Sequence, residues 1–167
     1  VEMKNIVFVF EGAHDVSFVG QILSKSGFTR NTSFSAIPDT WKQLYPRSFP
    51  WNGDLLERVA RFPEVYTSPE FTIGLINAGS DSQLIPRLRV VIETLGLEGV
   101  DCMAIFADAD ALDASNRFKS VQKGLAKLNA DAIEEGVPGY PIGVPTEMAS
   151  LSAGSPAVGV FVFPNNA

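Results

Sequence analysis

The sequence contains one cysteine and one histidine, and each scarcity excludes a class of site. Cys102 alone cannot form an internal disulfide or a Cys-x-x-Cys zinc site, and its apolar surroundings predict a small buried side chain. His14 alone cannot supply the His-Glu-x-x-His pattern of zinc proteases, and we expect it to be a solvated or capping residue rather than a catalyst. The Gly-rich nucleotide-binding loops and the Gly-x-Ser-x-Gly elbow of serine hydrolases are also missing. Zinc, disulfide, nucleotide-loop and serine-triad chemistry therefore have no support in the sequence.

Long apolar stretches are also lacking. None approaches the ~20 residues needed to cross a bilayer. The first residues, Val1-Glu2-Met3-Lys4, lack the basic lead and small-residue cleavage site of a signal peptide. Among 167 residues, 46% are hydrophobic, which is ample for the core of one domain. We therefore expect a single domain over residues 1–167, located in the cytoplasm and not in a membrane.

Basic residues are outnumbered, with 13 Lys and Arg against 19 Asp and Glu and a net charge of −6. Because proteins bind phosphate backbones through cations, this balance argues against salt-driven nucleic-acid binding by the bare chain. Two bound divalent ions would, however, offset about four of the negative charges. DNA or RNA therefore stays open as a partner if the acidic residues hold metal.

Continuous runs of Val, Ile and Phe are typical of strands buried on both faces, and they occur at residues 6–10, 71–76, 103–107 and 158–163. Between these runs, apolar residues at helical spacing predict helices over about 14–26, 82–95 and 114–130. Alternation of this kind favours an α/β fold, with about four mostly parallel strands between helices.

Two segments interrupt the alternation. Residues 30–69 are turn-rich, aromatic and basic, which predicts an irregular insertion after the first helix, with a short helix at about 54–62. Residues 135–156 are rich in Gly, Pro and Ser and predict an irregular connection. Only four residues follow the last predicted strand, so we expect a chain truncated at its C-terminus, with further site residues beyond it.

Acidic residues directly follow two of the predicted strands. Glu11 comes after the first strand, and Asp108 and Asp110 come after the third. Ligands of open α/β sheets bind at the carboxyl ends of the strands, so these carboxylates converge if the two strands are neighbours. Such a concentration of like charge favours a cation, and carboxylate oxygens suit Mg²⁺ or Mn²⁺. An ion of this kind orients the attacking group and neutralises charge in phosphoryl transfer.

Structural explanations compete for most of these acids. Glu11 could be an ordinary loop residue, Asp15 a first-turn acid favoured by the helix dipole, and Asp113 an N-cap. The Asp108–Asp110 pair indicates function more strongly, because an acid-x-acid pair after a wholly apolar strand has few packing reasons to exist.

Two further segments are candidates for phosphate contact. The turn at Gly79 and Ser80 precedes a predicted helix and offers backbone N–H groups at its positive end, although an N-cap role for Ser80 or Asp81 explains it equally well. A basic row on the helix over 114–130 is either a solvated face or a track for a nucleic-acid backbone. The row consists of Lys119, Lys123 and Lys127, with Arg117 near its start.

The order and position of these motifs resemble the Toprim domain, which topoisomerases, bacterial primases, recombination mediators and the overcoming-lysogenization-defect nucleases share. The motifs read Val-Phe-Val-Phe-Glu-Gly at residues 7–12 and Ile-Phe-Ala-Asp-Ala-Asp at residues 105–110. The wider patterns at residues 11–15 and 108–113 are most similar to the nuclease-like branch and to small uncharacterised bacterial relatives.

The resemblance implies a compact four-stranded parallel sheet with Mg²⁺ held by Glu11, Asp108 and Asp110, and further metal positions at Asp15 and Asp113. Glu11 is similar to the family glutamate that acts as general acid or base. We therefore expect metal-dependent, nuclease-like hydrolysis of DNA or RNA, with water as the attacking group. Two alternatives remain. One is a non-catalytic Toprim-like module that binds nucleic acid, a nucleotide or a protein through the insertion. The other is a phosphatase-like enzyme, although the Asp-x-Asp-x-Thr pattern of such enzymes is missing.

Overall fold

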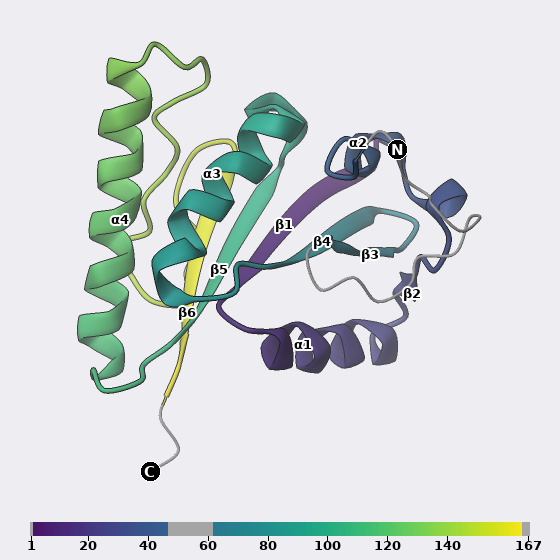
Figure 1. The fold of residues 1–167 in the computed structure, drawn as a ribbon, viewed down its shortest axis with the longest axis horizontal. Helices are drawn as coiled ribbons and strands as arrows, with labels where there is room; N and C mark the ends of the chain where they lie inside the picture. The colour runs from purple at the N-terminus through teal and green to yellow at the C-terminus, as the bar shows by residue number, and fades with distance from the viewer. Residues whose placement is uncertain (1, 47–61, 165–167) are drawn as a thin grey trace.

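A computed structural model describes residues 2–46 and 62–164, which form one six-stranded sheet with helices on both faces (Figure 1). The strands are β1 (Lys4–Phe10), β2 (Thr29–Arg30), β3 (Glu64–Thr67), β4 (Phe71–Asn77), β5 (Cys102–Asp108) and β6 (Ala157–Phe163). The α-helices are α1 (Ala13–Lys25), α2 (Asp39–Lys42), α3 (Leu84–Leu95) and α4 (Ala114–Glu134). Short 3₁₀ turns, among them η2 (Asp81–Gln83), join some of these elements.

The strand order is β2-β3-β4-β1-β5-β6. The four strands predicted from apolar runs, β4, β1, β5 and β6, are mutually parallel and form the larger part of the sheet. The α/β prediction is therefore confirmed. Because β1 lies between β4 and β5, with Phe10 level with both Asn77 and Phe106, the carboxyl ends of all three strands meet at one edge.

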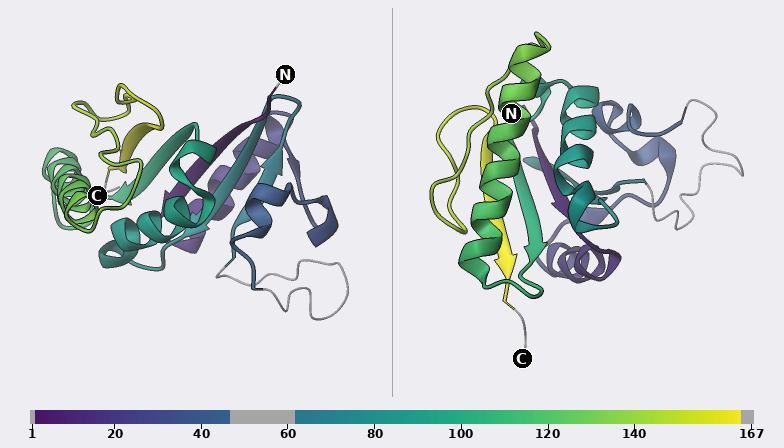
Figure 2. Two further views of the ribbon diagram at one scale, coloured as in Figure 1. Left: turned by 90° about the horizontal axis from the view of Figure 1, so that it is seen from above. Right: turned by 60° about the vertical axis from the view of Figure 1, so that its left-hand side comes forward.

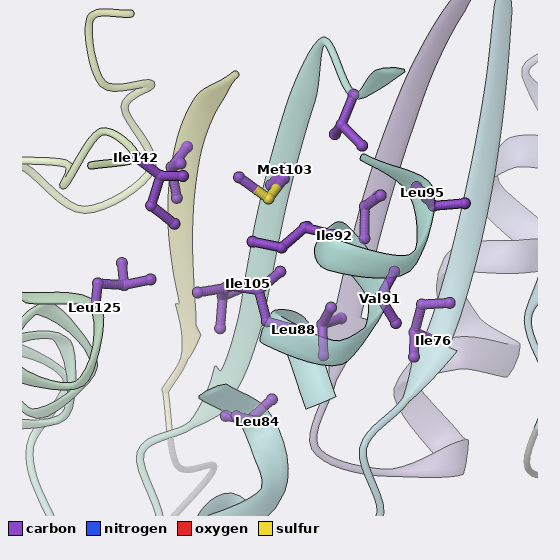
Figure 3. Close-up of a cluster of buried hydrophobic side chains, with 14 of the residues drawn as sticks. Ile76, Leu84, Leu88, Val91, Ile92, Leu95, Met103, Ile105, Leu125 and Ile142 are labelled. Carbon is purple, nitrogen blue, oxygen red and sulfur yellow. The ribbon is translucent and has the colours of Figure 1, made fainter. Parts of the chain in front are cut away.

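The central strands bury both faces, which is why their sequences are continuously apolar. On one face, Val7 and Met103 pack under α3 and α4, where Leu88, Leu125 and their neighbours close the core (Figures 2 and 3). On the other face, Phe10 and Leu75 pack under α1. Burial of each such side chain contributes about 1.5–3 kcal/mol, so the two cores hold the strand ends in fixed positions.

The insertion over residues 30–69 is more regular than predicted. It contributes α2 and β3, and β3 adds to the sheet in antiparallel orientation beside β4. Trp41 of α2 is fully buried and donates an indole hydrogen bond to Thr72 Oγ1 at 2.7 Å. Gly74 makes room for it, since a Cβ there would lie 2.1 Å from the Trp41 ring. The helix predicted at about 54–62 lies outside the described residues except for its last position.

The remaining predictions differ in detail. The connection after α4 is irregular as expected, apart from an isolated bridge between Leu151 and Gly159. Cys102 is half-buried rather than fully buried because it opens β5 at the amino edge, and burial raises the pKa of its thiol. No helix within residues 2–46 and 62–164 is long and apolar enough to cross a membrane.

Candidate functional site

The two strands that precede the acidic motifs are neighbours, so the condition for a shared acidic edge is met. Glu11 follows β1 and is buried, with 9% of its surface exposed. Its Oε2 atom accepts a hydrogen bond from the backbone N–H of Asp108 at 2.7 Å. The Glu11 carboxylate therefore links the end of β1 to the end of β5.

A buried arginine compensates part of this negative charge. Arg117 of α4 is 5% exposed, and its Nη2 donates to Glu11 Oε2 at 3.2 Å and also to Asp81 Oδ1. Burial works to lower the pKa of Arg117, but hydrogen bonds and attraction from Asp81 and Glu11 raise it overall, so the guanidinium stays charged. Arg117 thus brings together groups that follow β1 and β4.

The burial of Arg117 corrects its predicted place in a row with the exposed lysines of α4. The signal that identifies it is its spacing. Arg117 and Val121 occupy successive positions of the buried stripe that continues through Leu125 and Leu128. An arginine on an apolar helical stripe requires a buried partner, and here the partner is Glu11.

Three aspartates interact electrostatically at the same edge. The pKa of Asp108 is raised, first by burial and then by repulsion from Asp15 and Asp110, while Arg117 works in the opposite direction. The pKa of Asp15 is raised by burial and by repulsion from Glu11, with a smaller lowering from the exposed His14. Of the carboxylates expected to converge, Glu11 contacts the backbone of Asp108, and Asp15 and the exposed Asp110 are near enough to raise the pKa of Asp108.

Asp110 and Asp113 occupy the loop between β5 and α4. Asp110 has a positive φ of 50°, a conformation that aspartate tolerates better than most residues. Asp113 is the N-cap of α4, since its Oδ1 accepts from the Asn116 backbone N–H at 2.8 Å and its Oδ2 from Asn116 Nδ2 at 2.7 Å. Of the two explanations for Asp113, the structure shows the cap.

Within residues 2–46 and 62–164, no three acidic, histidine or cysteine side chains form a group ready to hold a metal ion. The carboxylate of Asp15 is near enough to that of Asp108 to raise its pKa. Carboxylate oxygens have the chemistry that Mg²⁺ and Mn²⁺ prefer, and Mg²⁺ commonly uses only one or two of them, with water and phosphate oxygens at the other positions. The chemistry of these two carboxylates therefore suits a hard divalent ion, whose remaining ligands would have to come from outside the described side chains.

The predicted phosphate contacts are engaged in local hydrogen bonds. The Gly79 backbone N–H donates to Asn77 Oδ1 at 2.9 Å, and the Ser80 hydroxyl lies 3.2 Å from that of Ser82. Ser80 is the N-cap residue of η2 but makes no side-chain capping bond, and α3 begins only after this turn. The turn therefore does not present a free helix N-terminus.

The basic row on α4 is exposed, as either interpretation of it requires. Lys119 and Lys123 point away from the core, and Lys127 forms an ion pair with Asp131 one turn later. Without Arg117, the row consists of lysines alone, and a solvated face accounts for it. Neither candidate for phosphate contact adds a cation to the acidic edge.

Comparisons with known proteins provide a family and a fold. No curated protein matches this chain. A solved structure of hypothetical protein PH0156 from Pyrococcus horikoshii OT3 is similar in fold, with a TM-score of 0.52 and 22% sequence identity over 75% of this chain. The similar region spans 47% of that protein, so the chain corresponds to about half of its length. A family model described as "Protein of unknown function (DUF3226)" matches residues 4–167, and the chain therefore belongs to the DUF3226 family.

Proposed function

We propose that this chain is a Mg²⁺- or Mn²⁺-dependent domain that processes phosphodiester bonds of nucleic acid in a nuclease-like manner. The observation that carries the proposal is that Glu11, after β1, accepts a hydrogen bond from the backbone N–H of Asp108, after β5, so that both acidic motifs share one edge of the sheet. At this edge, burial and then repulsion from Asp15 and Asp110 raise the pKa of Asp108. Repulsion of this kind destabilises the metal-free protein, and a bound cation would relieve it. The order of the motifs and the resemblance to the Toprim domain give further support.

The ion would be held by Asp15 and Asp108, with Asp110 close enough to affect the charge of Asp108. When bound, it would supply a Lewis acid that neutralises charge on the phosphoryl oxygens. We leave Asp113 out of the proposed site because both its oxygens already serve the cap of α4.

Glu11 is proposed to move a proton during attack by water. Its Oε2 is held by Arg117 and the Asp108 backbone, whereas its Oε1 accepts no hydrogen bond from any residue in 2–46 or 62–164. One oxygen is therefore fixed in position while the other stays available for a proton. Arg117 would act as a positioning residue, because it contacts Glu11 and Asp81 from its buried place in α4.

The proposal is tested by incubating the purified chain with single- and double-stranded DNA and RNA, in Mg²⁺, in Mn²⁺ or in a chelator. We expect cleavage that depends on metal and that disappears in an Asp15→Asn, Asp108→Asn variant. Glu98→Gln is the matched control, since Glu98 is acidic but lies beyond the amino end of β5. Cleavage that survives in the double variant would contradict the assignment of the site.

One observation favours a second candidate, a non-catalytic Toprim-like module that binds nucleic acid. The Arg117 guanidinium already balances Glu11 and Asp81 without any metal. For this candidate, the same assay gives nucleic-acid binding in a folded protein without cleavage in either metal. Deleting the insertion is not a suitable test, because it would remove β3 from the sheet and Trp41 from the core.

A further inference from the structure

A partly open cavity of about 660 Å³ is lined by residues of α1, β2, β3 and β4. This volume falls within the range of about 300–1,000 Å³ that small-molecule sites occupy. Val16 and Leu75 lie in its apolar wall, Phe62 adds aromatic surface, and the buried Tyr66 lies behind it with only 4% of its surface exposed. None of the acidic residues of the proposed metal site lines this cavity.

On the sheet side of the cavity, three polar side chains interact with one another. Arg30 Nη2 lies 3.1 Å from Glu64 Oε1, and the Tyr66 hydroxyl donates to Glu64 Oε2 at 3.2 Å. Burial and the nearby Glu64 raise the pKa of Tyr66 to about 12, so the phenol keeps its proton at neutral pH. Gly20 gives the hydroxyl room, since a Cβ there would lie 2.4 Å from it.

The cavity has an excess of positive charge in an otherwise acidic chain. Among the described residues that line it, Lys25 and Arg30 are accompanied by one carboxylate, that of Glu64. Lys25 is exposed and forms no ion pair with any residue in the described part of the chain. The chain as a whole has a net charge of −6. A cavity lined by two cations therefore stands out on this chain as a region that favours binding of an anion.

We propose that the cavity binds a nucleoside monophosphate, independently of metal and of the acidic site. Lys25 and Arg30 would receive the phosphate, which needs cationic donors. The sugar hydroxyls would donate to Glu64, as ribose hydroxyls do to acidic residues in other nucleotide sites. The base would lie against Phe62, whose half-buried ring offers aromatic surface for stacking.

The proposal is tested by titration calorimetry with adenosine monophosphate, adenosine and inorganic phosphate, all in the presence of a chelator. We expect saturable binding of the nucleotide and binding at least about tenfold weaker for each of its two parts. Equal affinity for inorganic phosphate, or no saturable binding of the nucleotide, would overturn the proposal.

Substitutions of residues that line the cavity test whether the nucleotide binds there. Lys25→Ala should weaken nucleotide binding about tenfold, through loss of one charge-assisted contact, and Gln21→Trp should weaken it further by filling the cavity. Lys119→Ala removes the same charge from an exposed position of α4 and should change nothing. Asp108→Asn should also leave nucleotide binding intact, which separates this site from the proposed metal site. Unchanged affinity in both cavity variants, with folding confirmed by thermal unfolding, would contradict the proposal.

Discussion

Arg117 donates a hydrogen bond to Glu11 across 106 positions of the sequence and joins the first turn of α4 to the end of β1. Both side chains are at least nine-tenths buried. Removal of one partner of such a pair leaves the other charge without compensation, which costs more than the pair itself contributes.

Arg117→Ala should therefore lower the free energy of unfolding by about 3 kcal/mol. Chemical denaturation with and without the substitution measures this difference. Lys127→Ala breaks an exposed ion pair on the same helix and should cost less than about 1 kcal/mol. Similar losses for the two variants would show that Arg117 is not a buried partner of Glu11.

Neutralising the crowded aspartates should stabilise the metal-free protein. The pKa values of Asp15 and Asp108 in the folded protein lie above their ordinary value of 3.8. At a pH between 3.8 and these raised pKa values, the folded state therefore binds more protons than the unfolded state. The free energy of unfolding therefore falls as pH rises through that window and stays lower at neutral pH. Asp15→Asn or Asp108→Asn should raise the free energy of unfolding at pH 7. The gain should be no more than about 1 kcal/mol, because solvent screens these partly exposed charges.

Thermal unfolding in a chelator at pH 7 and at pH 3 checks this prediction. The gain should be present at pH 7 and should vanish at pH 3, where the carboxyls of the unmodified protein are protonated. A loss of stability at pH 7 in both variants would contradict the prediction, because it would mean that attraction of Asp15 and Asp108 to cationic side chains outweighs their repulsion from other acids.

Gly74→Ala should destabilise the fold, because the new Cβ would lie 2.1 Å from the ring of Trp41. Overpacking of this kind typically costs about 1–3 kcal/mol. Gly99→Ala is the matched control, since a Cβ at that position meets nothing within 4 Å. Equal unfolding midpoints for the two variants would contradict the close packing of α2 on β4.

The role of Asp113 can be separated by two substitutions. Asp113→Ala removes the N-cap of α4 and should cost about 1 kcal/mol, whereas Asp113→Ser keeps a capping oxygen and should cost little. Neither variant should change the affinity for Mn²⁺ if the residue is only a cap. A loss of Mn²⁺ affinity in Asp113→Ser, with stability retained, would return the residue to the metal site.

The sequence predicted the parallel core of the fold well, because β1, β4, β5 and β6 are buried on both faces and therefore read as continuous apolar runs. It did not predict β3. That strand has only four residues, lies next to the sheet edge and shows no apolar run. It joins the sheet by pairing with β4 over Glu64–Thr67, a contact that its own short sequence does not predict.

The meeting of Glu11 and Asp108 was predictable from the parallel strands, whereas the place of Arg117 was not predicted. Glu11 and Asp108 were expected to converge because the ends of parallel strands share an edge, and register then brings them together. Arg117 was missed because its charge suggested a solvated lysine-like position, while its spacing on the buried stripe of α4 was the informative signal.

Titration calorimetry of Mn²⁺ into the unmodified chain and into the Asp15→Asn, Asp108→Asn variant tests the central claim most directly. We predict saturable binding to the unmodified chain that is lost in the variant and retained in Glu98→Gln. Saturable binding of equal strength in all three proteins, or none in the folded unmodified chain, would contradict a metal site at the acidic edge.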